Sequence, residues 1–194
     1  MHGTNRPDVL TGTPGFDIFI AGPGDDFIEP GDGDLVFAGT GDDVVRFGVV
    51  DGAVVHLGPG DDRADLSFSS DRNRVYGEEG DDTFDSDANG LNLLDGGVSN
   101  DSYLLSNTGS DTVETGSGDD HILVSRGTAI DVSAGAGDDT ITVQSGSEQT
   151  AVDGDAGFDS LLRDRDSEIV SCSSSIEDVE EFGIGDAFSA CPAP

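Results

Sequence analysis

Aspartates that follow a glycine recur at even intervals along most of the chain. The tripeptide Gly-Asp-Asp stands at 24–26, 41–43, 60–62, 80–82, 118–120 and 137–139, and looser versions stand between these positions. The last aspartate of each motif serves as a marker, which gives Asp8, Asp17, Asp26, Asp34, Asp43, Asp62, Asp82, Asp101, Asp120, Asp139 and Asp159. Carboxylate oxygens are hard ligands, so a regular series of them indicates binding of a hard cation such as Ca²⁺.

The charge of the chain also points to a bound cation. Its 194 residues include 41 Asp and Glu but only 8 Lys and Arg, which gives a formal net charge of −33. Carboxylates stacked at the strand spacing of about 4.8 Å repel one another and raise each other's pKa unless cations lie among them. Transition metals would require His or Cys, which the motifs lack. Even with on the order of eight Ca²⁺ ions bound, the protein would remain acidic.

The composition argues against several classes of partner and activity. Nucleic acid and anionic membrane surfaces would need a basic face, and none is available. No segment approaches the roughly 20 apolar residues of a membrane span, and no signal-like apolar core follows the first residues, which we interpret as a trimmed or mature N-terminus. No catalytic grouping stands out from the repeated carboxylates, so we predict that the chain is not an enzyme.

The marker spacing describes the elements that must hold these aspartates. Successive markers stand 8 or 9 residues apart as far as Asp43, and 19 or 20 residues apart after it. A coil of two strands and two turns takes about 18 residues, so the doubling indicates that later coils keep a Gly-Asp sequence in only one of their two turns. We therefore expect a two-sided start over 1–44, one-sided coils over 45–165 and a C-terminal cap over 166–194.

Apolar residues in register with the markers predict how the coils pack. Two residues after the markers stand Val45, Ala64, Phe84, Tyr103, Ile122, Ile141 and Leu161. Seven residues before the markers stand Val55, Val75, Leu94, Val113, Val132 and Val152. Alternation along a strand turns such columns toward one interior. We predict an all-β fold, a parallel β-roll or β-helix solenoid with two strands in each coil, and ordinary loops on the side opposite the Gly-Asp turns.

Several segments resemble the repeats-in-toxin family, whose nonapeptide is Gly-Gly-x-Gly-x-Asp-x-apolar-x. They lie at 22–28, 58–64, 116–122 and 135–141. The resemblance implies a parallel β-roll held by Ca²⁺ between adjacent turns. It makes the markers metal ligands, with Asp17 and Asp34 on one side and all the others on the opposite side. It also implies that the residue before each marker contributes its backbone carbonyl, while its side chain is solvated. The turns before Asp8, Asp101 and Asp159 depart from the family pattern.

The C-terminal segment predicts a cap on the stack. Residues 175–183 begin with Ser, place apolar residues at 176, 179 and 182, and end in Gly, which is typical of a short helix. The only cysteines, Cys172 and Cys191, suggest one disulfide that fastens the tail, and hence an oxidising compartment. Two unpaired cysteines in a frayed tail are the alternative.

These features favour a calcium-binding module outside the cell. We expect a secreted or cell-surface chain that folds when it binds Ca²⁺ and serves as a structural, adhesin, surface or filament subunit. Its partners would be calcium ions, together with either copies of itself joined end to end or a cell-surface polymer. A carbohydrate-binding or ice-binding module and a polysaccharide-acting β-helix enzyme are the alternatives.

Overall fold

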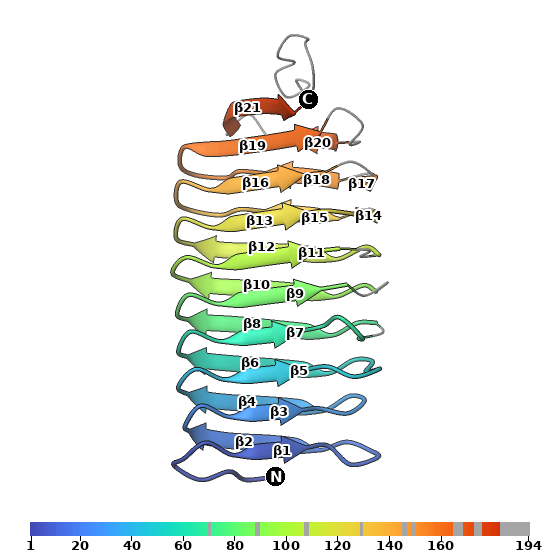
Figure 1. Cartoon of the computed structure of the whole chain (residues 1–194), viewed down its shortest axis with the longest axis vertical. Helices are drawn as coiled ribbons and strands as arrows, with labels where there is room; N and C mark the ends of the chain where they lie inside the picture. Colours follow the sequence, from blue (N-terminus) through green and yellow to red (C-terminus); the bar gives the residue numbers. More distant parts are fainter. Residues whose placement is uncertain are drawn as a thin grey trace.

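The computed structural model describes residues 1–69, 71–87, 90–106, 109–128, 130–144, 147–148, 150–164, 169–172 and 176–182. Within these residues the chain is all β, and none of them is helical. The strands wind into a solenoid whose coils are stacked along one axis, with the N-terminus at one end of the stack (Figure 1). The predicted fold class is confirmed.

Two parallel sheets form the walls of the solenoid, and each coil contributes one strand to each wall. The first sheet has ten strands in the order β1 (Val9–Thr11), β3 (Phe27–Glu29), β5 (Val44–Arg46), β7 (Arg63–Asp65), β9 (Thr83–Ser86), β11 (Ser102–Leu105), β13 (His121–Val124), β16 (Thr140–Val143), β19 (Asp159–Asp164) and β21 (Ile176–Phe182).

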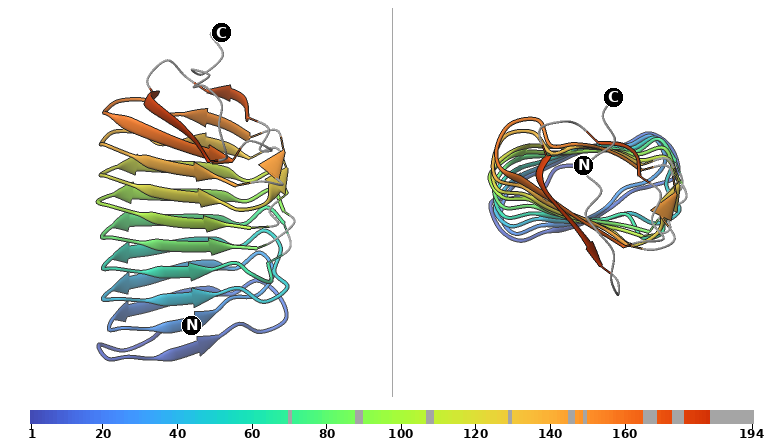
Figure 2. Two further views of the ribbon diagram at one scale, coloured as in Figure 1. Left: turned by 45° about the horizontal axis from the view of Figure 1, so that its top comes forward. Right: turned by 90° about the horizontal axis from the view of Figure 1, so that it is seen from above.

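The second sheet has nine strands in the order β2 (Ile18–Pro23), β4 (Leu35–Thr40), β6 (Val54–Pro59), β8 (Arg74–Glu79), β10 (Leu93–Val98), β12 (Thr112–Ser117), β15 (Asp131–Ser133), β18 (Thr150–Asp153) and β20 (Ile169–Cys172). A small third sheet pairs β14 (Gly127–Thr128) with β17 (Ser147–Glu148). Seen along the axis, the coils form a flattened ring with the two large sheets as its long sides (Figure 2).

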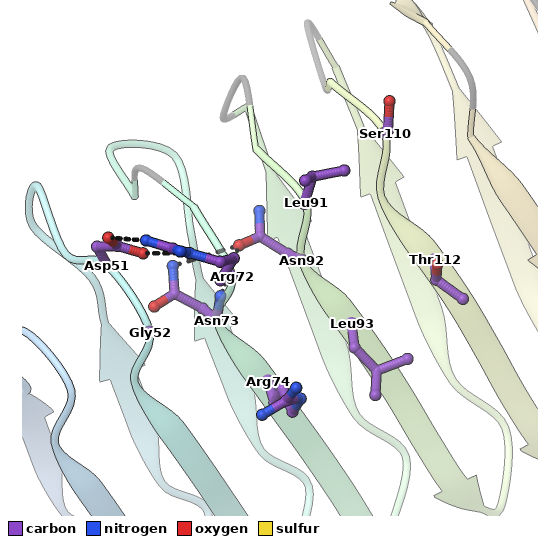
Figure 3. A pocket seen from close by; sticks show the side chains of 10 residues that line it. All are labelled: Asp51, Gly52, Arg72, Asn73, Arg74, Leu91, Asn92, Leu93, Ser110 and Thr112. Carbon is purple, nitrogen blue, oxygen red and sulfur yellow. Dashed lines mark hydrogen bonds and ion pairs between the residues drawn. The ribbon is translucent and has the colours of Figure 1, made fainter.

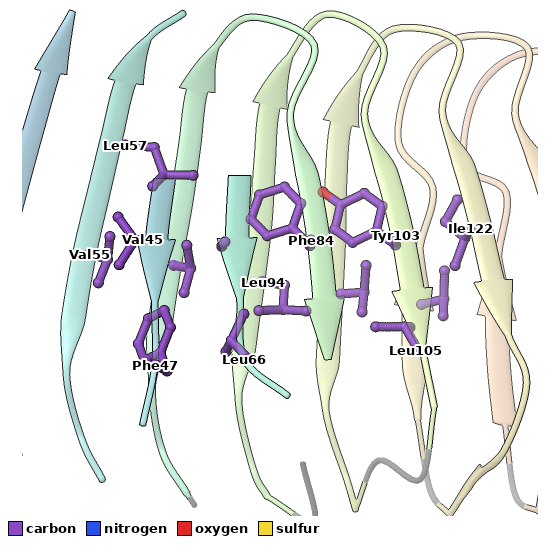
Figure 4. Close-up of a cluster of buried hydrophobic side chains, with 14 of the residues drawn as sticks. Val45, Phe47, Val55, Leu57, Leu66, Phe84, Leu94, Tyr103, Leu105 and Ile122 are labelled. Atoms are coloured by element: carbon purple, nitrogen blue, oxygen red, sulfur yellow. The ribbon is translucent and has the colours of Figure 1, made fainter. Parts of the chain in front are cut away.

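The core lies between the two large sheets and follows the predicted apolar columns. Strand pairing places Leu94 beside Val75 and Val113, so residues at the same position of successive coils become neighbours. All the predicted column residues are buried, from Val45 to Leu161 in the first sheet and from Val55 to Val152 in the second. Figure 4 shows part of this stack, in which the rings of Phe84 and Tyr103 lie nearly parallel with centroids 4.7 Å apart. Burial of these columns supplies the hydrophobic stabilisation of the coils.

Two kinds of connection join the sheets. Compact turns lead from a second-sheet strand to the next first-sheet strand and lie along the left edge in Figure 1. Wide loops make the return connection along the opposite edge. Glycine is required in the compact turns, because successive turns pack closely: Gly39 has φ +126, and a Cβ there would lie 1.9 Å from the carbonyl oxygen of Gly22.

The prediction of a C-terminal helix is wrong. Residues 176–182 form β21, which pairs in parallel with β19 and places Val179 beside Leu161. The edge of β19 presents unpaired backbone groups, and pairing with them outweighs the helical spacing of the apolar residues at 176, 179 and 182. One register shift, between Asp159 and Ser160, accommodates the less regular sequence. Ladder pairing therefore continues beyond Leu161, where the sequence repeat fades.

None of the described residues belongs to a helix long and apolar enough to cross a membrane.

Candidate metal centre

The compact turns bring eight of the marker aspartates into one line, called here the inner aspartate row. Its members each end a compact turn and are at most 2% exposed: Asp26, Asp43, Asp62, Asp82, Asp101, Asp120, Asp139 and Asp159. In every step of the row, one carboxylate oxygen, Oδ1, accepts the backbone N–H of the aspartate one coil earlier, as Asp62 does from Asp43 at 2.6 Å. The row is thus a ladder of charged groups that is hydrogen-bonded on one oxygen.

The second carboxylate oxygen, Oδ2, has no such support in most of the described members of the row. Among the described residues, buried Oδ2 atoms without a hydrogen-bond partner belong to seven members of the row, Asp26, Asp43, Asp62, Asp82, Asp101, Asp120 and Asp139. Burying a polar atom without a partner costs on the order of 1 to 3 kcal/mol, and more when it is charged. Seven such oxygens in line make the folded state strongly unfavourable, unless a bound cation or another group interacts with them.

Burial and mutual repulsion raise the pKa values of several members of the row. Desolvation is the largest cause, and neighbouring aspartates add to it. The pKa of Asp43 rises to about 6, that of Asp62 to about 8, and those of Asp82, Asp101 and Asp139 to about 7. In the absence of a cation, much of the row would therefore bind protons near neutral pH.

The donor set of the row fits calcium. It consists of carboxylate and backbone oxygens, the ligands that Ca²⁺ prefers, and it includes no nitrogen or sulfur ligand. Within the described part of the chain, no three His, Cys, Asp or Glu side chains converge on one point. A cation here would therefore take carboxylate oxygens from the row and complete its shell with backbone carbonyls and water. Its positive charge would meet the orphaned Oδ2 atoms.

The residues before the markers form a second line, called here the outer row, on the solvent side of the same turns. Its members are exposed: Asp25, Asp42, Asp61, Asp81, Asn100, Asp119 and Asp138. Their Oδ1 atoms accept backbone N–H groups from the following coil, as Asp42 does from Asp61 at 3.1 Å. The hydrogen bonds of the outer row thus run in the direction opposite to those of the inner row. Because they are exposed, water can solvate these side chains.

Three predicted ligands differ from the inner row. The Oδ2 atom of Asp8 accepts the backbone N–H and hydroxyl of Thr4, and that of Asp17 accepts the same two groups of Thr13. The Oδ2 atom of Asp34 accepts the backbone N–H of Gly31 at 2.6 Å. The backbone N–H of Thr13 is the main cause of a lowered pKa for Asp17. These carboxylates lack the orphaned oxygens of the inner row, although strand pairing aligns Asp8 with the inner row and places Asp17 and Asp34 together in the wide loops.

The turn before Asp101 departs from the family pattern but keeps the geometry of its neighbours. Ser99 occupies the position that glycine takes in the turns on either side, and it adopts φ +89. Asp101 remains in the ladder, since its Oδ1 accepts the N–H of Asp82 and its own N–H donates to Asp120. Local backbone strain at Ser99 is therefore tolerated within the stack.

The prediction of ordinary loops on the side opposite the Gly-Asp turns is wrong over three coils. Asn73, Asn92 and Asp111 are at most 2% exposed and form a second ladder inside the wide loops, called here the asparagine ladder. The backbone N–H of Asn73 donates to Asn92 at 3.1 Å, and that of Asn92 donates to Asp111 at 2.9 Å. Each member stands two residues before a second-sheet core residue, as the markers do in the first sheet. This two-residue offset from the core residues is the signal by which the ladder could have been predicted. It was missed because two of the three positions carry Asn in place of Asp.

Asp111 makes the asparagine ladder sensitive to pH. Burial raises its pKa to about 6, although the Asn92 N–H and the Ser86 hydroxyl donate to its carboxylate. Because the raised pKa favours the protonated form in the fold, the contribution of Asp111 to stability is complete below about pH 4 and is lost as the pH rises through 6. Two pKa units correspond to about 3 kcal/mol.

We therefore expect Asp111→Asn to stabilise the calcium-loaded protein by roughly 1 to 3 kcal/mol at pH 8 and by about half as much at pH 5. The amide can keep both hydrogen bonds, since the Ser86 hydroxyl can also accept one. Urea unfolding at the two pH values measures the difference. The exposed Asp131, one coil on, provides the control Asp131→Asn, for which the stability gain should be below 0.5 kcal/mol. An equal gain from Asp111→Asn at both pH values would contradict the assignment.

A groove of about 640 Å³ lies beside the asparagine ladder (Figure 3). Arg72 lines it and forms an ion pair with Asp51 at 2.7 Å, while Arg74, Leu91 and Leu93 contribute guanidinium and apolar surface. The one carboxylate among the described lining residues, that of Asp51, is paired with Arg72, and two guanidinium groups border the groove, so it does not resemble the inner aspartate row.

The predicted disulfide falls largely outside the described residues. Backbone pairing places Cys172 opposite Val152 in the second sheet, in line with the core column. Cys191 lies outside the described residues, so the pairing of the two cysteines stays a prediction.

Comparison with protein families finds one match. Four copies of the RTX calcium-binding nonapeptide repeat match at residues 2–34, 69–90, 97–128 and 131–148. Together they cover more than half of the chain and contain five members of the inner row. Asp43 and Asp62 lie between the matched segments yet continue the same ladder. No curated protein and no solved structure matches the chain.

Proposed function

The chain belongs to the RTX calcium-binding nonapeptide repeat family, and from that premise we propose that it is a structural solenoid that folds when Ca²⁺ occupies its inner aspartate row. A calcium-binding β-roll is the structural module that such repeats form. The proposal adds to this that the calcium-free chain cannot hold the fold at neutral pH.

The observation that carries the proposal is the set of seven buried, unpartnered Oδ2 atoms in the inner row. Without a cation, each is either an uncompensated charge inside the fold or a carboxyl that must bind a proton, and a typical domain has only about 5 to 15 kcal/mol of stability to offset such costs. Divalent cations would neutralise these oxygens and link one coil to the next. Because the sites exist only in the stacked coils, the free energy of binding becomes free energy of folding.

We further propose that the protein works outside the cell. Folding that depends on calcium keeps a chain unfolded where calcium is scarce and folds it after export. The segments 1–44, 45–165 and 166–194 would then be the start, shaft and cap of a rigid spacer, with Cys172 and Cys191 joined in an oxidising environment. Its proposed roles are those of an adhesin, surface or filament subunit, through end-to-end association or contact with a surface polymer.

Far-UV circular dichroism during a calcium titration tests coupled folding. We expect a coil spectrum in EDTA at pH 7.5, a cooperative change to β-structure on addition of millimolar Ca²⁺, and reversal by chelator. Mg²⁺ is the control, because its small octahedral shell suits a flexible row of carbonyls and carboxylates poorly. A β-spectrum that excess EDTA leaves unchanged would contradict the proposal.

A further inference from the structure

One buried hydroxyl points at the inner aspartate row from within the core. Tyr103 is 2% exposed, and its phenol oxygen has no hydrogen-bond partner among the described residues. Its ring stacks on Phe84, and its oxygen lies on the side of the ring that faces the compact turns (Figure 4). A tyrosine hydroxyl buried in this way normally finds a partner, so the absence of one calls for an explanation.

The space in front of this hydroxyl is created by Gly96 in β10. A Cβ on Gly96 would lie 2.1 Å from Oδ2 of Asp101, 2.3 Å from the hydroxyl oxygen of Tyr103 and 2.6 Å from the backbone oxygen of Thr115. A carboxylate, a phenol and a carbonyl oxygen thus border the same small space. Within the described part of the chain, neither the Asp101 Oδ2 atom nor the Tyr103 hydroxyl has a hydrogen-bond partner. The lack of a side chain at Gly96 keeps the space open.

This arrangement belongs to one coil only. At the position of Tyr103 the other described coils carry apolar residues, which are Leu10, Ile28, Val45, Ala64, Phe84, Ile122, Ile141, Leu161 and Val179. At the position of Gly96, the neighbouring coil after it carries Thr115, whose hydroxyl donates to the carbonyl oxygen of Ala134. The same coil has Ser99 and Asn100 where most others have Gly and Asp. A phenol oxygen therefore enters the row at the coil whose turn departs from the repeat.

We propose that the Tyr103 hydroxyl is an additional oxygen ligand of a cation held at Asp101, in the space that the backbone oxygen of Thr115 also borders. The inference rests on the proposed calcium-dependent function and deepens it by giving one site a donor that the repeat sequence does not provide. A phenol oxygen is a neutral hard donor, so it adds a ligand without adding to the repulsion within the row. A site with this extra ligand compensates for the irregular turn at Ser99 and Asn100.

Luminescence of Tb³⁺, a hard cation that replaces Ca²⁺, tests where Tyr103 lies relative to the ion. Tyrosine close to bound Tb³⁺ sensitises its emission, and the chain has no Trp and only two Tyr. The second, Tyr76, lies in β8 and stacks on His56 at 4.9 Å on the outer face of the second sheet. Tyr76→Phe should keep the tyrosine-excited emission, whereas Tyr103→Phe should lose most of it. Excess Ca²⁺ should quench the emission by competition.

The calcium isotherm tests whether the hydroxyl binds the ion or only lies near it. Tyr103→Phe keeps the ring that stacks on Phe84, so circular dichroism in excess Ca²⁺ should match that of the unchanged protein. One class of sites should weaken about tenfold, the effect of losing one oxygen partner of a charged group. Gly96→Ala fills the space itself, because its Cβ would lie 2.3 Å from the Tyr103 hydroxyl oxygen, and it should weaken the same class of sites. Tyr76→Phe is the matched control and should leave the isotherm unchanged.

Two results would overturn the inference. Absence of sensitised emission in Tyr76→Phe would place the ion away from Tyr103, and this test needs no change at the site itself. An unchanged isotherm in Tyr103→Phe would mean that a buried water, not a cation, joins the three oxygens. Failure of the proposed function would look different, since no variant, nor the unchanged protein, would then fold in response to Ca²⁺.

Discussion

Asp62→Asn is expected to have opposite effects on the calcium-loaded and the calcium-free protein. With Ca²⁺ bound, loss of the carboxylate removes a charged ligand and should lower the free energy of unfolding by about 3 kcal/mol. Without Ca²⁺, the same change removes a buried charge whose pKa the fold raises to about 8. The calcium-free variant should therefore gain stability. The hydrogen bond from the Asp43 N–H can be kept, because the amide oxygen replaces Oδ1.

Asp61→Asn is the matched control for this prediction. Asp61 is the adjacent residue in the same turn, carries the same charge and is exposed in the outer row. Its substitution should change stability by less than about 0.5 kcal/mol under either condition. Urea unfolding in excess Ca²⁺ measures the loss, and the β-signal in EDTA with sucrose, which favours compact states, measures the gain. If Asp61→Asn and Asp62→Asn behaved alike, the division into inner and outer rows would have no functional meaning.

Protonation of the inner row at acidic pH is expected to stabilise the calcium-free fold, as calcium is expected to do at neutral pH. A carboxyl whose pKa is higher in the fold than in the unfolded chain contributes stability that is complete below the unfolded pKa near 3.8 and is lost as the pH rises through the folded pKa. The folded pKa is about 6 for Asp43, about 7 for Asp82, Asp101 and Asp139, and about 8 for Asp62. The calcium-free chain should therefore hold β-structure at pH 5 and lose it between pH 6 and pH 8.

The size of this effect follows from the number of groups that titrate together. A pKa shift of two units corresponds to about 3 kcal/mol for each carboxyl. The combined free energy for several row members is therefore comparable with the whole free energy of unfolding of a typical domain, about 5 to 15 kcal/mol. Circular dichroism in EDTA from pH 8 down to pH 5 measures the transition. Lower pH values are avoided because the sequence pI is about 4.1. Protein in excess Ca²⁺ is the control and should keep its β-spectrum throughout. A coil spectrum in EDTA at pH 5 would show that repulsion within the row does not limit folding.

The asparagine ladder shows how much of the site a sequence reveals. The inner row was predicted residue by residue from Asp26 to Asp159, because glycine and aspartate at a constant spacing are conspicuous. Asn73, Asn92 and Asp111 have the same spacing, yet their loops contain residues of many types and differ in length. Their shared role depends on burial, which turns an ordinary polar side chain into an obligatory hydrogen-bond partner. Only the structure shows that burial.

The C-terminal strand β21 shows a different limit of prediction from the sequence. The apolar spacing of residues 176–182 suits a helix when the segment is considered alone, but the free edge of β19 offers a complete set of backbone partners. Whether a short segment becomes helix or strand therefore depends on a neighbour that is distant in the sequence. In the coils between the two ends no such conflict arises, because strand alternation and turn glycines agree at most repeats, with Ser99 as one exception.

The sequence by itself determined the period, the two apolar columns and the line of marker aspartates. It could do so because parallel, in-register stacking makes every nineteenth or twentieth residue a spatial neighbour, so a column in the sequence is a column in space. The tertiary structure decided which oxygen of each carboxylate is left without a partner, and which polar side chains elsewhere are buried. Those properties depend on the direction in which a side chain points and on what packs against it. They distinguish Asp8, Asp17 and Asp34, whose carboxylates accept hydrogen bonds from nearby residues, from the inner row, whose buried carboxylates favour binding of calcium.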